Sequence, residues 1–140
     1  MQTIEKERTE DAAQTGRIES ELRQWPTQLR LVPPSAPWLK NADLLIAADC
    51  TPFAYAEFHR DFIKDRVLVN ACPKLDDTSD YVEKLAAIIA ENDLKSLTVA
   101  IMEVPCCRGL SMMAEQAIAK SGKDIQMELA VIGVNGEKRI

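Results

Sequence analysis

Residues 96–110 of the chain read Ser-Leu-Thr-Val-Ala-Ile-Met-Glu-Val-Pro-Cys-Cys-Arg-Gly-Leu, an apolar run that ends in two adjacent cysteines. Residues 96–102 are rich in β-branched side chains and almost continuously apolar, which is typical of a strand that is buried on both faces. Pro105 ends the strand because proline cannot donate a ladder hydrogen bond. Over residues 107–120, apolar side chains recur three and four positions apart, which predicts an amphipathic helix. The two cysteines are therefore predicted to lie in a strand-to-helix turn.

This turn is a position at which a thiol becomes reactive or becomes a good metal ligand. The free amides and the dipole at a helix N-terminus stabilise an anion. We therefore expect Cys106 and Cys107 to ionise more easily than an ordinary cysteine, which favours roles as metal ligands or nucleophiles.

The composition predicts one domain and excludes some classes of partner. A chain of 140 residues with 46% apolar and 28% charged residues is typical of a single globular domain with one core. A net charge of -5 argues against nonspecific binding to nucleic acid or to anionic membranes. The longest apolar runs are too short to span a bilayer, and the first residues lack the apolar segment of a secretory signal. We therefore expect a cytoplasmic protein.

The hydrophobic pattern predicts a three-layer α/β/α sandwich with a mainly parallel sheet of about five strands. Residues 1–20 bury nothing recognisable and are predicted to form a mobile or loosely docked arm, followed by a single α/β domain over residues 21–140. The predicted strands are residues 29–32 at a sheet edge, 42–49, 66–71, 96–102 and 125–134. The predicted helices are residues 53–63 after an N-cap at Thr51, 79–91, and 107–120 with Gly122 as its stop.

Three cysteines each follow a different predicted strand. Cys50, Cys72 and Cys106 lie just past the C-terminal ends of their strands, at intervals of one strand-helix unit. In a parallel sheet all of those ends emerge on one edge, which is where open α/β folds bind ligands. Together with Cys107, every cysteine of the chain is therefore expected at that edge.

Three hypotheses account for such a group of thiols. Convergent thiolates bind soft metals, which means an iron-sulfur cluster or zinc, with Cys50, Cys72, Cys106 and Cys107 as candidate ligands. Alternatively, two thiols form a redox pair in an oxidoreductase, or the cysteines merely pack a core as small buried residues. His59 is predicted to be a packed or hydrogen-bonded residue rather than a ligand.

Five segments of the sequence resemble a known family. They are residues 21–29 (ELRQWPTQL), 42–50 (ADLLIAADC), 58–62 (FHRDF), 72–77 (CPKLDD) and 102–107 (MEVPCC). Together they are similar to a family of anaerobe iron-sulfur proteins, in which this module commonly follows a ferredoxin-like domain with two four-iron (4Fe-4S) clusters. The resemblance implies a redox-associated protein whose cysteines bind, or receive electrons for, an iron-sulfur centre.

The chain departs from the longer members of that family in one respect. It has no C-x-x-C-x-x-C run and no cysteine before Cys50. A module of this kind must carry its own cofactor or act on that of a partner, so we expect an electron-transfer module that works with a ferredoxin-like or other redox protein. These residues favour a redox or binding module over a stand-alone enzyme, and they are compatible with a homo-oligomer.

Overall fold

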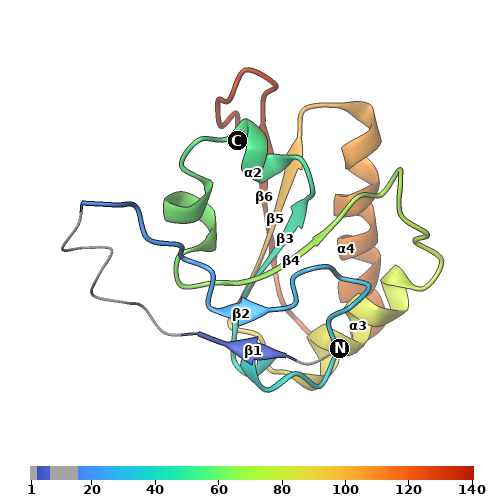
Figure 1. The fold of residues 1–140 in the computed structure, drawn as a ribbon. Coiled ribbons are helices and arrows are strands. Elements are labelled where there is room, and N and C mark those ends of the chain that lie inside the picture. Colours follow the sequence, from blue (N-terminus) through green and yellow to red (C-terminus); the bar gives the residue numbers. More distant parts are fainter. Residues whose placement is uncertain (1–2, 7–15) are drawn as a thin grey trace.

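A computed structural model describes residues 3–6 and 16–140 of the chain. Its centre is a four-stranded parallel sheet with the strand order β4-β3-β5-β6 (Figure 1). The strands are β3 (Asp43–Ala48), β4 (Val67–Ala71), β5 (Ser96–Met102) and β6 (Met127–Ile132). The two central strands, β3 and β5, are buried along almost their whole length, as their continuous apolar runs predict.

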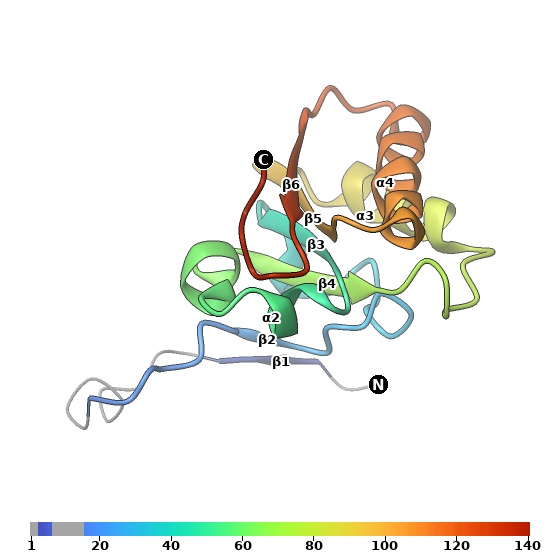
Figure 2. The ribbon, with the colours of Figure 1, turned by 90° about the horizontal axis from the view of Figure 1, so that it is seen from above.

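Helices cover both faces of this sheet. The long helices α3 (Tyr81–Glu91) and α4 (Arg108–Ser121) pack side by side on one face. The short helix α2 (Thr51–Ala54) and a π-helical turn (His59–Ile63) lie on the other (Figure 2). The predicted three-layer α/β/α class is therefore confirmed, with a sheet of four strands rather than about five.

The missing strand is the one predicted at residues 29–32. The amides of Leu31 and Val32 both donate to the carbonyl of Gln28, at 2.9 and 3.1 Å, so this segment is a tight turn. Leu29 and Val32 are fully buried while Leu31 is exposed, which is the three-residue period of a turn rather than the alternation of a strand. The predicted position at the sheet edge is right, because the amide of Leu29 donates to the carbonyl of Asn70 in β4.

Beside the backbone bonds that Thr27 and Leu29 make with Asn70, one side chain completes the hydrogen bonding along the edge of β4. Gln24 is 1% exposed, and its amide nitrogen donates to the carbonyl of Leu68 at 2.7 Å while its oxygen accepts from the amide of Leu68. A glutamine side chain thus replaces a neighbouring strand at this point. Gln24 also belongs to β2 (Gln24–Trp25), which pairs antiparallel with β1 (Ile4–Glu5).

This pairing places part of the predicted N-terminal arm against the domain. The rest of that arm, residues 1–2 and 7–15, lies outside the described residues. The predicted boundary at residue 20 stays a prediction.

The helix predicted over residues 53–63 is broken in two. It starts earlier than predicted, with Cys50 as N-cap and Thr51 inside the first turn, where the Thr51 hydroxyl donates to the carbonyl of Ala48. The chain becomes extended at Tyr55, and this break lets the Tyr55 ring meet Phe62 edge-on while Phe58 stacks on the same ring.

The third predicted helix and its stop are confirmed. A 3₁₀ turn at Pro105–Cys107 leads from β5 into α4, and Gly122 ends α4 in the left-handed conformation (φ 74°) that glycine adopts without strain. A second short 3₁₀ turn, Pro37–Leu39, precedes β3.

Candidate functional site

The carboxyl ends of the sheet strands carry all four cysteines, as predicted. Cys72 directly follows β4, Cys50 follows β3 by two residues, and Cys106 and Cys107 lie in the 3₁₀ turn after β5. Figure 2 looks onto this edge, which we call the thiol edge, and shows α2, the turn into α4 and the loop after β4 facing the viewer. All four thiols are free.

The order of the strands marks one point on the thiol edge. From β3 the chain moves to β4 on one side, and it then crosses over to β5 on the other side of β3. The crevice between the ends of two such strands is where open α/β sheets bind ligands. Here Cys50 stands on the β3 side of that crevice, and Cys106 and Cys107 stand on the β5 side.

Two of these thiols influence the third. Burial of Cys107 raises its pKa above the ordinary value of a thiol, a backbone hydrogen bond with Met102 opposes the rise, and the charges of Cys106 and Cys50 add to it. Cys107 is therefore within electrostatic range of sulfurs that come from both sides of the crevice. We predicted that the N-terminus of α4 would make Cys107 ionise more easily. This prediction is wrong, because desolvation has the larger effect on the pKa of Cys107.

Cys72 reaches the same region through the contact of its loop with α4. A side-chain carbon placed on Gly109, in the first turn of α4, would lie 3.3 Å from the Cβ of Pro73. The absence of a side chain at Gly109 thus lets the Cys72–Pro73 segment pack directly against the turn that carries Cys106 and Cys107.

The four thiols share this edge without forming a closed ligand group. Within residues 3–6 and 16–140, no three His, Cys, Asp or Glu side chains are grouped so that they could hold a metal ion. Cys50 and Cys106 are exposed to solvent, Cys72 is half-buried and Cys107 is buried. Their role as ligands stays a prediction.

Acidic residues next to the cysteines brace the strand ends. The Asp49 carboxylate accepts from the side-chain amide of Asn70 at 2.6 Å and so ties the end of β3 to β4. Glu103 forms an ion pair of 2.6 Å with Arg139, which anchors the chain after β6 to the start of the double-cysteine loop. Both carboxylates are therefore engaged with side chains.

His59 is a hydrogen-bonded residue, as predicted. Its Nδ1 accepts a hydrogen bond from the amide of Glu21 at 3.1 Å. His59 begins the π-helical turn, which follows α2 in the sequence, whereas Cys50 precedes α2. Its ring nitrogen therefore fixes the segment that leads into β2.

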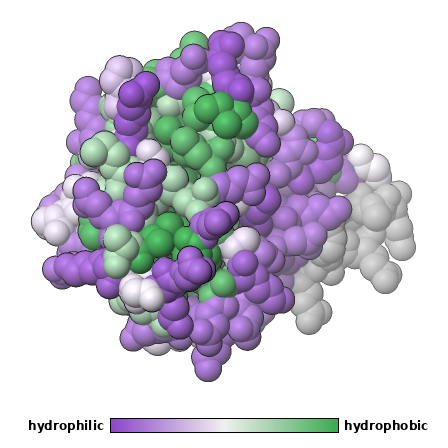
Figure 3. All heavy atoms as spheres, turned by 180° about the vertical axis from the view of Figure 1, so that it is seen from behind, coloured by the Kyte–Doolittle hydropathy of each residue, from purple (hydrophilic) through white to green (hydrophobic). Residues whose placement is uncertain are grey.

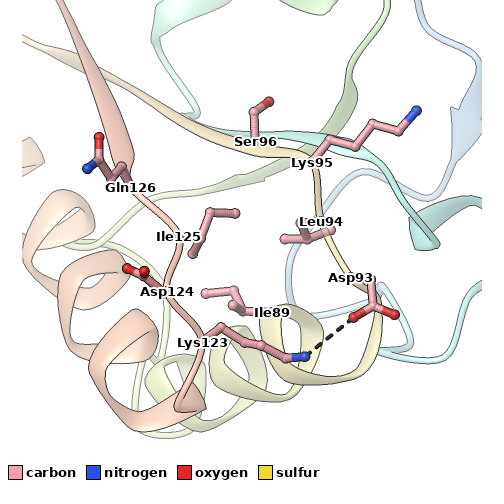
Figure 4. A pocket seen from close by; sticks show the side chains of 9 residues that line it. All are labelled: Ile89, Asp93, Leu94, Lys95, Ser96, Lys123, Asp124, Ile125 and Gln126. Atoms are coloured by element: carbon pink, nitrogen blue, oxygen red, sulfur yellow. Dashed lines mark hydrogen bonds and ion pairs between the residues drawn. The ribbon is translucent and has the colours of Figure 1, made fainter.

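Hollows lie near the carboxyl ends and near the amino ends of β5 and β6. One of about 750 Å³ adjoins the thiol edge between α4 and β6, and its lining includes Pro105, Arg108 and Met112. Another, of about 430 Å³, lies at the opposite edge, where β5 and β6 begin and where Lys123 pairs with Asp93 (Figure 4). Figure 3 shows that apolar side chains gather in the middle of the face turned away in Figure 1. The hollow in Figure 4 is remote from the cysteines and belongs to a different part of the molecule.

Comparison with known proteins agrees with this architecture. A model of the Rossmann-like domain family matches residues 36–140, which include every strand of the parallel sheet and all four cysteines. The chain belongs to the Rossmann-like domain family. An uncharacterized protein of Archaeoglobus fulgidus is 40% identical over 116 residues, which cover 83% of this chain and 81% of that protein. No solved structure matches the chain significantly.

Membership of the Rossmann-like domain family agrees with the crevice between β3 and β5 as the place to look for a ligand. The five scattered glycines of the sequence form no G-x-G-x-x-G run, which is the phosphate-binding fingerprint of dinucleotide-binding folds. What distinguishes this edge chemically is its thiols. Across the part of the chain that the structure describes, none of the helices has the length and apolar character needed to cross a membrane.

Proposed function

We propose that the thiol edge binds a soft-metal centre, specifically an iron-sulfur cluster, with Cys50, Cys72, Cys106 and Cys107 as its ligands. In this proposal the chain is a cytoplasmic electron-transfer module that exchanges electrons with a ferredoxin-like or other redox protein. The observation that carries the proposal is the position of the four cysteines, which follow three neighbouring strands of the sheet and stand on both sides of the crevice between β3 and β5.

The chemistry of the donor set supports a soft metal. Thiolate ligands select zinc, copper(I) and iron-sulfur clusters, whereas magnesium and calcium prefer oxygen. The oxygen donors next to the thiols, Asp49 and Glu103, are held by Asn70 and Arg139. The thiols of the edge are therefore the donors best placed to bind a metal, and the sequence resemblance favours iron over zinc.

The free thiols also support the proposed compartment. Four unpaired cysteines, two of them exposed, suit the reducing cytoplasm better than an oxidising compartment. Metal binding requires Cys50, Cys72 and Cys106 to close around the ion, since they are not grouped for coordination in this conformation.

The test is anaerobic purification followed by analysis of iron, acid-labile sulfide and zinc, together with a visible absorption spectrum. We expect iron and sulfide and a broad absorption that dithionite bleaches, and we expect Cys50→Ser and Cys106→Ser to lose both. Met112→Leu is the matched control, because it removes an exposed sulfur of α4 that we do not propose as a ligand.

Two outcomes would contradict the iron-sulfur proposal. Stoichiometric zinc without sulfide would identify a colourless, redox-silent site that stabilises the fold. A protein free of metal even after anaerobic reconstitution would leave thiol chemistry as the better account.

A further inference from the structure

The loop that follows β4 holds the sulfur of Cys72 in a network of hydrogen bonds. The amide of Leu75 donates to Sγ of Cys72 at 3.3 Å, so that one face of the sulfur is already occupied by a backbone N–H. Hydrogen bonds of this kind to sulfur stabilise thiolates in metal centres and tune them. Cys50, in contrast, precedes α2 and makes no capping hydrogen bond with its side chain.

Asp76 closes this loop. One of its carboxylate oxygens, Oδ2, accepts from the amide of Cys72 at 3.1 Å, and the amide of Asp76 in turn donates to the carbonyl of Cys72 at 3.0 Å. These two bonds connect the same pair of residues in opposite directions. They fix the turn that brings the amide of Leu75 onto the sulfur.

The loop is also anchored to the core. The hydroxyl of Tyr81 donates to the same Oδ2 of Asp76 at 2.8 Å, and Tyr81, the first residue of α3, is 1% exposed. Arg30 lies over the Tyr81 ring, 5.8 Å from its centre. The position of the Asp76 carboxylate is therefore set by a residue that cannot move without disturbing the core.

The outer side of the loop is open to solvent. Lys74 is exposed and Leu75 is 83% exposed, so burial of these two side chains does not hold the turn in place. On the inner side Pro73 packs against the start of α4, where a side-chain carbon on Gly109 would lie 3.3 Å from the Cβ of Pro73. The backbone around Cys72 is therefore held by the hydrogen bonds of Asp76, together with the bond that Arg30 donates to the carbonyl of Asp77.

From these contacts we propose that Asp76 is a positioning residue, which holds Cys72 as the preformed anchor of the thiol edge. This inference deepens the proposed metal site. It is tested on the metal-free protein, so that its failure and the failure of the metal proposal can be told apart.

The experiment measures the alkylation of each cysteine by iodoacetamide in the metal-free, reduced full-length protein, with peptide mass spectrometry to separate the sites. Rates are compared as the limiting rate of the fully ionised thiolate, taken from a pH series, because a thiolate released from its hydrogen bond is more nucleophilic and more accessible. In the wild type we expect Cys72 to react more slowly than Cys50. Asp76→Ala should accelerate Cys72 roughly five- to tenfold, the factor that corresponds to loss of about one hydrogen bond, and should leave Cys50 unchanged.

Two further variants separate positioning from general stability. Asp76→Asn keeps an oxygen that can accept from Cys72 and Tyr81, so it should restore the rate of Cys72 to within about twofold of the wild type. Tyr81→Phe removes only the hydroxyl that anchors the Asp76 carboxylate, and it should accelerate alkylation of Cys72 by roughly twofold. This variant takes the place of Asp76→Ala if Asp76→Ala does not fold. Each variant is first shown to unfold cooperatively.

The proposal is overturned if a folded Asp76→Ala protein alkylates Cys72 at the wild-type rate. It is also overturned if Cys50 and Cys106 accelerate by the same factor as Cys72, because that result would indicate a general loosening of the domain. A selective acceleration of Cys72 that Asp76→Asn reverses would establish the positioning role, whatever the metal content of the purified protein.

Discussion

Replacing Cys107 with alanine tests whether this thiol belongs to the core or to a metal centre. Cys107 is 7% exposed and belongs to the main hydrophobic cluster. Loss of its sulfur removes an apolar group about the size of a methylene, worth about 0.8 kcal/mol of transfer free energy. A residual cavity of about 25 Å³ adds about 0.6 kcal/mol. We therefore expect Cys107→Ala to lower the free energy of unfolding of the metal-free protein by about 1.5 kcal/mol.

The assay is urea unfolding of the metal-free, reduced proteins, followed by circular dichroism. Cys107→Ser should cost more than Cys107→Ala, about 2–3 kcal/mol, because it buries a hydroxyl. The matched control is Cys106→Ala, which removes the neighbouring exposed thiol and should change stability by less than about 0.5 kcal/mol. Alkylation gives an independent check, since burial raises the pKa of Cys107 and leaves less thiolate near neutral pH. Cys107 should be the slowest of the four to react.

A Cys107→Ala protein as stable as the wild type, together with fast alkylation of Cys107, would refute the reasoning from burial. Metal analysis of the same variant then decides the role of the thiol. If Cys107→Ala loses about 1.5 kcal/mol but retains iron and sulfide, Cys107 is a core residue beside the centre. If the metal is lost as well, Cys107 is a ligand.

Two further predictions concern Gln24 and Tyr81, which hold the elements around the thiol edge in place. Gln24→Ala should lower the free energy of unfolding by about 2–4 kcal/mol in urea titrations, because both buried backbone groups of Leu68 lose their partner. The exposed control Gln126→Ala should change the free energy of unfolding by less than about 0.5 kcal/mol. Equal effects of the two variants would contradict the bridging role of Gln24. Burial, and then the hydrogen bond to Asp76, raise the pKa of Tyr81 to about 12, so the folded state holds this proton more tightly than the unfolded chain does. The stability that this shift contributes is complete below pH 10 and is lost as the pH rises towards 12. Between these pH values we expect the free energy of unfolding to fall by up to about 2 kcal/mol in the wild type and by less in Tyr81→Phe. If the free energies of unfolding of the two proteins fall in parallel with pH, the assignment to Tyr81 is refuted.

The central strands and the two long helices could be predicted because their patterns have one physical meaning. An apolar run of six or seven residues, as in β3 and β5, is explained by burial on both faces of a sheet. The period of α4 and the glycine that ends it are equally direct signals. In these elements local preference and tertiary packing agree.

The prediction failed where a tertiary contact overrides the local pattern. Gln24 is a polar residue of a type that is usually exposed, and nothing in the sequence indicates that its amide completes the edge of β4. Residues 29–32 have the composition of a strand, yet the burial of Leu29 and Val32 requires a turn. The helix predicted over residues 53–63 breaks at Tyr55, where the chain becomes extended, although Tyr55, Phe58 and Phe62 have the spacing of one helix face and their rings still pack together.

The same distinction explains how much of the candidate site could be predicted. A parallel sheet fixes where its strands end, so it places the residues just after β3, β4 and β5 at one edge, but its control over a side chain weakens with each residue beyond the strand. Cys72 comes first after β4 and is held by its loop, Cys50 comes second after β3, and Cys106 comes fourth after β5, in an exposed turn. The edge is therefore a property of the strands, which the sequence pattern reports. The distances between the sulfurs are a property of the loops, and Asp76 shows that such a loop is ordered by contacts between residues that no periodic pattern links.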